Sequence, residues 1–146
     1  MDQQDGPFLA MAVFCERVLE EKTGVLSLIR VIDRLQIEGA PMPSQEAPPL
    51  PASLTAVVSF KAGSARGSHN LAIRPESPAG LHLPEASLTV LFEGEDRGVN
   101  AIVGISVPIQ QEGLYWFDVL LDGQRVTRMP LRIVYQRIGF GYPTPS

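Results

Sequence analysis

The stretch from Gly113 to Tyr135, GLYWFDVLLDGQRVTRMPLRIVY, constrains the fold more than any other part of the chain. Side chains alternate between the two faces of a β-strand, so apolar residues of one parity predict a buried face. That face carries Tyr115, Phe117, Val119 and Leu121 on one strand, and Met129, Leu131, Ile133 and Tyr135 on the next. Asp122-Gly123 between them tolerates positive φ, as a tight hairpin turn requires. The stretch therefore predicts an antiparallel β-hairpin.

Short apolar runs separated by turn residues continue through the rest of the chain. Residues 8–20 fit either a strand or one side of a helix. The β-branched run from Val25 to Leu35, behind a turn at Glu21–Gly24, favours a strand–turn–strand unit. Loops are expected at Ala62–Ser68 and Glu93–Gly98, where glycine and charge gather. Further strands are expected near Leu54–Lys61, His69–Ile73, Leu88–Phe92 and Val99–Val107.

Thirteen glycines and thirteen prolines in 146 residues suit many short strands joined by turns. We expect an all-β fold, a two-sheet antiparallel immunoglobulin-like β-sandwich of about eight strands. Five prolines between Pro41 and Pro51 predict a surface crossover, because proline lacks the N–H that a central strand donates. Residues 1–135 are expected to form a single domain, and residues 136–146 a tail rich in glycine, proline and aromatic residues.

Charge and cysteine content exclude several classes of function. The formal net charge of −4 offers no general field for nucleic acid or an anionic membrane, so we expect neither as a partner. A single cysteine, Cys15, excludes an intramolecular disulfide and suits a reducing cytosol. The apolar run Phe8–Cys15 is far shorter than the roughly 20 residues that span a bilayer. We expect a cytoplasmic protein.

Two segments of the sequence resemble a known protein family. Phe14-Cys15-Glu16-Arg17, followed by Gly24–Arg34, resembles the opening of a family of short, uncharacterised bacterial proteins. The alternating residues of the hairpin, with Asp122-Gly123 and Pro130-Leu131, are similar to the closing segment of that family. The resemblance implies a bacterial β-sandwich of unknown function and a strand at residues 8–20. It transfers no catalytic residue.

The chain contains few of the residues that form metal sites or act as nucleophiles, with two histidines and one cysteine. His69 and His82 have no cysteine or glutamate at a ligand-like spacing, so we expect neither a metal nor another cofactor. Cys15 lies in an apolar run and is expected to be a buried small hydrophobe rather than a nucleophile. Arg66, in its glycine-rich loop, offers a weak anion site. The three carboxylates of Glu93–Gly98 fit a solvated turn better than a calcium site.

Isolated carboxylates also argue against acid–base catalysis. Asp118 and Asp122 are expected to be solvated, at the outer face and the turn of the hairpin. Asp33 interrupts an apolar run, and a structural ion pair with Arg30 or Arg34 explains it better than catalysis does. We therefore expect a protein that is not an enzyme.

The second face of the hairpin remains as a candidate interaction surface. Leu114, Trp116 and Leu120 point away from the predicted core, and tryptophan is enriched at binding hot spots. Phe140 and Tyr142 in the tail offer further aromatic contacts. The first hypothesis is a protein partner or self-association, as an accessory or oligomeric subunit. The alternative is a small-ligand or carbohydrate-binding module that uses Trp116, Tyr115 or the loops.

Overall fold

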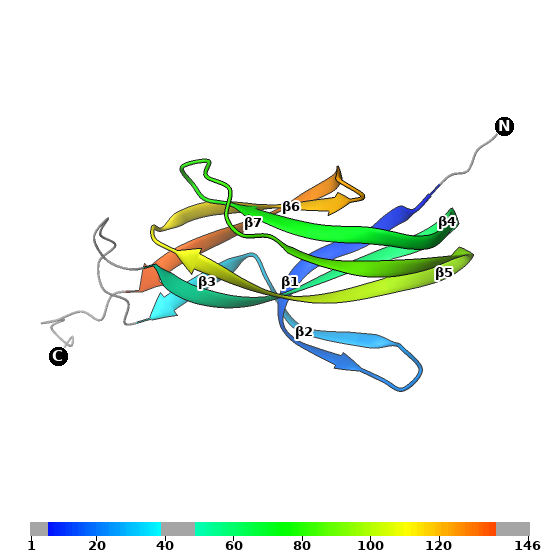
Figure 1. Ribbon diagram of the computed structural model, residues 1–146. Helices are drawn as coiled ribbons and strands as arrows, with labels where there is room; N and C mark the ends of the chain where they lie inside the picture. The colour runs from blue at the N-terminus through cyan, green and yellow to red at the C-terminus, as the bar shows by residue number, and fades with distance from the viewer. Residues whose placement is uncertain (1–5, 39–48, 137–146) are drawn as a thin grey trace, which may run out of the picture.

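The computed structural model describes residues 6–38 and 49–136 (Figure 1). Over these residues the only regular elements are β-strands, and no helix is long and apolar enough to cross a bilayer. The all-β expectation is confirmed. The strands are β1 (Phe8–Glu20), β2 (Leu26–Ile32), β3 (Arg34–Glu38), β4 (Leu50–Glu76), β5 (Ala86–Ile109), β6 (Gly113–Leu121) and β7 (Gln124–Gln136).

Backbone hydrogen bonds join the seven strands into one mixed sheet. The order is β2-β1-β4-β6-β7-β3, with β5 paired to β4. All pairs are antiparallel except β3 with β7, which is parallel. The expectation of two separate, purely antiparallel sheets is therefore not met. The reason is the length of β4, which pairs with β1 near its start and with β6 near its end.

Two expected loops are bulges inside long strands. β4 runs unbroken through Ala62–Ser68, and β5 runs unbroken through Glu93–Gly98. Gly63 and Gly94 adopt positive φ, of 61° and 90°, and the β4–β5 register shifts on both sides of Gly63. A bulge absorbs extra residues and bends a strand without ending its pairing. Glycine here marks bending rather than reversal, so each expected pair of strands is one strand.

The expected 25–35 strand is divided at Asp33 instead. β2 and β3 flank this single residue, yet they lie at opposite ends of the strand order. The sheet must therefore curl until its two ends approach each other. The Arg132 N–H donates to the Asp33 carbonyl at 3.1 Å and ties the crossing to β7. The Arg30 guanidinium pairs with Glu16 across the β1–β2 ladder, at 3.0 Å, rather than with Asp33.

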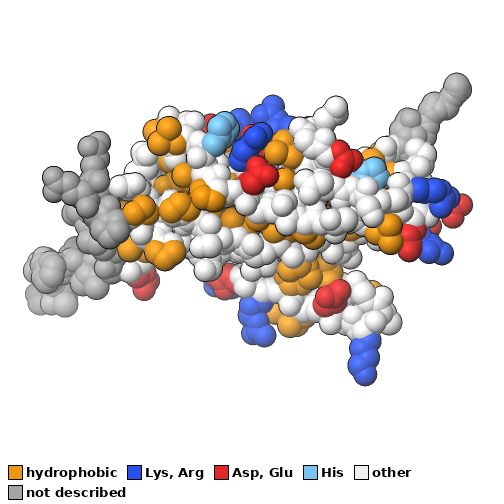
Figure 2. Space-filling view, viewed as in Figure 1, with side chains coloured by type: hydrophobic (Ala, Val, Ile, Leu, Met, Phe, Trp, Pro, Cys, Tyr) orange, Lys and Arg blue, Asp and Glu red, His pale blue; other side chains and the backbone are white. Residues whose placement is uncertain are grey.

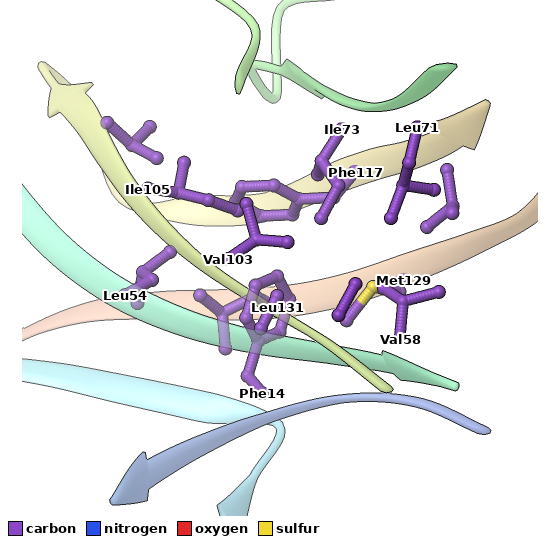
Figure 3. Packing of buried hydrophobic residues seen from close by; sticks show 14 of the residues in the cluster. Phe14, Leu54, Val58, Leu71, Ile73, Val103, Ile105, Phe117, Met129 and Leu131 are labelled. Carbon is purple, nitrogen blue, oxygen red and sulfur yellow. The ribbon is translucent and has the colours of Figure 1, made fainter. Parts of the chain in front are cut away.

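Curling places the apolar faces of distant strands against each other. Phe14 of β1 meets Phe117 of β6 edge to face, with ring centroids 4.8 Å apart. Figure 3 shows Phe14 pointing from β1 into the same cluster as Leu131 of β7 and Ile105 of β5. The buried parity predicted for the hairpin is confirmed, from Tyr115 to Leu121 and from Met129 to Tyr135.

The predicted hairpin turn is also confirmed. Asp122 and Gly123 both adopt positive φ, of 50° and 82°, between β6 and β7. Such a pair matches the twist of the strands that it joins.

Beyond Cys15, β1 leaves the body of the sheet. Its pairing with β4 ends at Cys15–Thr55, while its pairing with β2 continues to Glu20–Leu26. We call the ribbon of residues 16–31 the arm. It projects below the rest of the molecule in Figure 1. Residues 8–20 are a strand, as the resemblance implied.

Candidate interaction surface

The outer face of β6 is only partly open. Leu114 and Trp116 are half-buried, whereas Leu120 is 7% exposed and is removed from the candidate surface. Sequence alternation placed Leu120 outward correctly but did not reveal its neighbours. β6 lies between β4 and β7, which put Ala72 on one side of Leu120 and Arg125 on the other. Side chains of the strands on both sides shield the outer face of an inner strand, so this face is less exposed than that of an edge strand.

Arg128 contacts several side chains on the outer face of β6 and its neighbours. Its guanidinium lies 4.8 Å from the centre of the Trp116 ring, which is a cation–π contact. Its Nε donates to Asp118 Oδ1 at 2.7 Å, and its Nη2 lies 3.6 Å from Glu76 Oε1. One arginine therefore lies against a face of the tryptophan and pairs with two carboxylates at the same time.

The expectation that Asp118 is solvated is wrong. Only 10% of its side chain is exposed, and Arg125 Nη1 approaches the same carboxylate oxygen at 3.7 Å. A buried carboxylate needs compensating charge and hydrogen bonds, and Arg128 and Arg125 supply them. The pairing of Asp118 with Arg128 across β6 and β7 was a signal available in the sequence once the hairpin register was known.

The other aromatic candidates fare differently. Tyr115 is 1% exposed, and its hydroxyl donates to the Gln111 carbonyl at 2.7 Å. Burial raises the pKa of Tyr115. This side chain is therefore unavailable to a ligand. Phe140 and Tyr142 lie outside the described residues.

The arm carries an exposed apolar surface that sequence analysis missed. Leu19, Val25 and Val31 expose 45%, 56% and 58% of their surface. Figure 2 shows hydrophobic side chains lying among charged ones over the arm. The available signal was the run Val25–Ile32, which is apolar on both strand parities.

Asp122 is exposed, as expected, yet it is bonded rather than free. Its Oδ2 lies 2.6 Å from His69 Nδ1, and its Oδ1 accepts the Asn70 N–H at 2.8 Å. The second ring nitrogen, Nε2, lies 3.2 Å from the Arg66 carbonyl. Both nitrogens face acceptors, so the protonated imidazole satisfies the site best. His69 therefore lies within β4, not at the start of a strand, and its side chain binds Asp122 of the hairpin turn. We call this contact the His69–Asp122 pair.

The His69–Asp122 pair makes the free energy of unfolding depend on pH in two directions. The hydrogen bond to Asp122 raises the pKa of His69. That stabilisation is complete below the unfolded value of about 6.5 and is lost as pH rises through the folded value. The hydrogen bonds from Asn70 and then His69 lower the pKa of Asp122. That contribution is present above about pH 4 and is lost as pH falls through the folded value.

The remaining polar candidates are structural. The Arg66 guanidinium donates to the Glu93 carbonyl at 2.9 Å and packs on Gly94, so it is engaged rather than open to an anion. Arg97 binds the Glu93 carboxylate at 2.9 Å. Within residues 6–38 and 49–136, no cluster of three or more histidine, cysteine or acidic side chains has the geometry of a metal site.

A groove of about 660 Å³ lies between β3 and the start of β4. Its walls include Arg34, Gln36 and Glu38 from β3, and Ser53 and Thr55 from β4. Cys15 also borders this groove.

Cys15 is nevertheless only 3% exposed, as expected of a small hydrophobe. Burial raises the pKa of its thiol, which opposes formation of the nucleophilic thiolate.

Comparison with known proteins agrees with the resemblance seen in the sequence. The sequence profile described as "Family of unknown function (DUF6941)" matches residues 10–134, which cover all seven strands except the first two residues of β1 and the last two of β7. No curated protein matches the chain. The matched region includes the arm, the curled sheet and the Arg128 cluster. The chain therefore belongs to the family of unknown function DUF6941.

Proposed function

We propose that the protein works through protein–protein contacts, as an accessory or oligomeric subunit rather than an enzyme. The observation that carries this proposal is the arm. It is a two-stranded ribbon that extends beyond the core and holds three exposed large apolar side chains.

A ribbon of this kind gains little from standing alone. An isolated two-stranded hairpin is marginally stable in water, since neither face has a layer to pack against. Leu19 and Val31 share one face, because alternate pairs of the β1–β2 ladder include them. Covering their exposed halves contributes about 1 kcal/mol each. A partner surface laid on this face would complete the layer that the chain itself lacks.

The test compares the wild-type chain with the double variant Leu19→Ser/Val31→Thr. Both would be cross-linked in cell extract and analysed by mass spectrometry, with light scattering on the purified proteins. We expect the double variant to lose cross-links at the arm and to bind less of a hydrophobic dye, with its melting temperature little changed.

A matched control is Leu91→Ser on β5, which removes a side chain that is 55% exposed and lies away from the arm. If the control and the arm variant lose the same cross-links, the arm is not the contact surface. Wild-type protein that forms no cross-link at the arm, under conditions where other surface residues react, would contradict the proposal.

A second candidate function is small-ligand binding, and the groove beside β3 favours it. Its volume of about 660 Å³ is within the usual range of ligand sites, and Gln36, Ser53 and Thr55 offer polar contacts. The aromatic version of this hypothesis loses support, because Tyr115 is buried and Arg128 covers a face of Trp116. A thermal-shift screen with polar metabolites and glycans tests it, with Gln36→Ala as the check on location.

The proposal extends to architecture and location. The Phe14–Phe117 contact supports describing the curled sheet as a two-layer, immunoglobulin-like sandwich, with hydrogen bonds continuing between layers through β4 and β5. A buried, unpaired cysteine suits the cytoplasm. Fractionation of cells that express the tagged chain would test the location.

A further inference from the structure

β3 ends the strand order and leaves one edge open. β7 is its sole strand partner over the described ranges 6–38 and 49–136. The other edge presents backbone N–H and C=O groups beside the groove that β3 shares with β4. Unpaired edges of this kind are templates for another strand.

This edge carries two charged residues, Arg34 and Glu38, but lacks several other features that block such pairing. β3 is Arg34-Leu35-Gln36-Ile37-Glu38, without proline, lysine or a residue of positive φ. At the opposite end of the order, β2 is distorted by Arg30, whose φ is 58°. Among the described residues, the edge of β3 is protected by its shortness and by these two charges, which a partner of matching charge would neutralise.

The sequence of β3 is complementary to itself when two copies run antiparallel. Centred on Gln36, the pairing places Arg34 opposite the second copy's Glu38, and Leu35 opposite its Ile37. The two-fold axis then passes between two Gln36 residues. We infer that the edge of β3 binds the β3 of a second copy of this chain, which forms a symmetric dimer with one sheet continuous across both subunits.

Burial along β3 agrees with this arrangement. Arg34, Gln36 and Glu38 are exposed on one face, whereas Leu35 and Ile37 are half-buried and pack against the core. The dimer therefore forms two charged pairs on the outer face and two apolar pairs on the inner face. Each copy extends the other's core over side chains that a monomer leaves partly uncovered.

Charge also selects the direction and register. A parallel pairing places Arg34 beside its own copy and Glu38 beside its own copy, which is repulsive. An antiparallel pairing shifted by two residues sets Arg34 against Gln36 and leaves charges unmatched. Only the register centred on Gln36 satisfies both ends. This inference deepens the proposed contact function by naming the partner of one edge, and it uses no residue of the arm.

The test exchanges the two charges and measures the mass of the full chain in solution by light scattering and sedimentation. Arg34→Glu makes the strand acidic at both ends, and Glu38→Arg makes it basic at both ends. We expect each single variant to dissociate at least about tenfold more readily than wild type. The wild-type chain is expected at twice the monomer mass of 15.9 kDa.

Two rescues separate pairing from a general loss of fold. The exchange Arg34→Glu/Glu38→Arg restores both pairs and should restore the dimer. Mixing the two single variants should give a heterodimer, since the acidic strand of one faces the basic strand of the other. As a location check, Gln36→Cys should form an intersubunit disulfide at the two-fold axis, because directly opposed strand residues lie within disulfide range.

Any one of four results would overturn the inference. One is a wild-type chain that remains monomeric up to about 1 mM. Another is a dimer whose mass ignores both single variants, and the third is failure of both rescues while circular dichroism remains native. The fourth, a dimer that responds to Leu19→Ser/Val31→Thr but not to charge exchange, places self-association on the arm. That result would support the proposed function and reject this edge.

Discussion

Replacing Arg128 by Met should reveal how strongly the outer face of β6 depends on one guanidinium. Methionine keeps most of the aliphatic length over Trp116 but removes the charge. The loss leaves Asp118, 10% exposed at its side chain, without the 2.7 Å hydrogen bond from Arg128 Nε. A buried carboxylate that loses its partner is a recognised source of large destabilisation.

The magnitude follows from the contacts. A hydrogen bond between charged groups contributes roughly 1.5–3 kcal/mol, and a cation–π contact that is partly exposed adds roughly 0.5–1 kcal/mol. Arg125, at 3.7 Å from Asp118, offsets part of the loss, and Arg128 itself is 32% exposed. We expect a decrease of about 2–3 kcal/mol in the free energy of unfolding. For a chain of this size, that lowers the melting temperature by roughly 6–9 °C.

Urea unfolding followed by tryptophan fluorescence measures the change, because Trp116 is the single tryptophan of the chain. The matched control is Arg97→Met, which breaks an ion pair of 2.9 Å between side chains that are 66% and 52% exposed. Water already solvates that pair, so its loss should cost less than about 0.5 kcal/mol. Equal costs for the two variants would refute the argument that burial of Asp118 decides the magnitude. A cycle with Asp118→Asn should show a coupling of about 1 kcal/mol or more.

Three further changes test the His69–Asp122 pair, the packing of Phe117 in the core and the bulge at Gly94. His69→Gln removes the protonated partner of the hairpin turn, so stability should fall less between about pH 6 and 8 than in wild type, as thermal melts across pH would show; a steeper fall would contradict the raised pKa of His69. Phe117→Ala opens a cavity opposite β1 and should cost about 3–5 kcal/mol in urea unfolding, whereas a cost under about 1 kcal/mol would mean that the two halves of the sheet do not pack there. Gly94→Ala forces a Cβ to within 2.5 Å of Arg66 Cζ at a φ of 90° and should cost at least about 1 kcal/mol. Gly104→Ala, where nothing lies within 4 Å, should be nearly neutral, and equal melting temperatures for the two glycine variants would count against the bulge.

Local patterns predicted the pieces of the fold well. Alternation identified the buried faces of β6 and β7, and Asp122-Gly123 identified the turn, because both depend on residues adjacent in sequence. The same local logic treated Ala62–Ser68 and Glu93–Gly98 as loops. Glycine permits a bulge and a reversal equally well, and the choice depends on whether a partner strand continues alongside.

The candidate site was harder to predict for a related reason. Burial of Leu120 and Asp118 depends on the strands on either side of β6, and these come from β4 and β7. The link between His69 and Asp122 joins residues 53 positions apart. The exposure of the arm depends on where β4 stops accompanying β1. Each of these relations depends on how strands pair, which a local pattern indicates only in part.

The sequence by itself determined an all-β chain, the parity of its core hairpin and the type of its turn, since steric and hydrophobic preferences act between neighbours. Tertiary structure alone decided that the strands form one curled sheet rather than two separate ones. That decision rests on β4 pairing with both β1 and β6, and on Asp33 carrying the chain from one end of the sheet to the other. Such pairings are chosen by the total burial that they allow. Within residues 6–38 and 49–136, the unpaired edge of β3 and the exposed side chains of the arm are where burial by the chain itself ends.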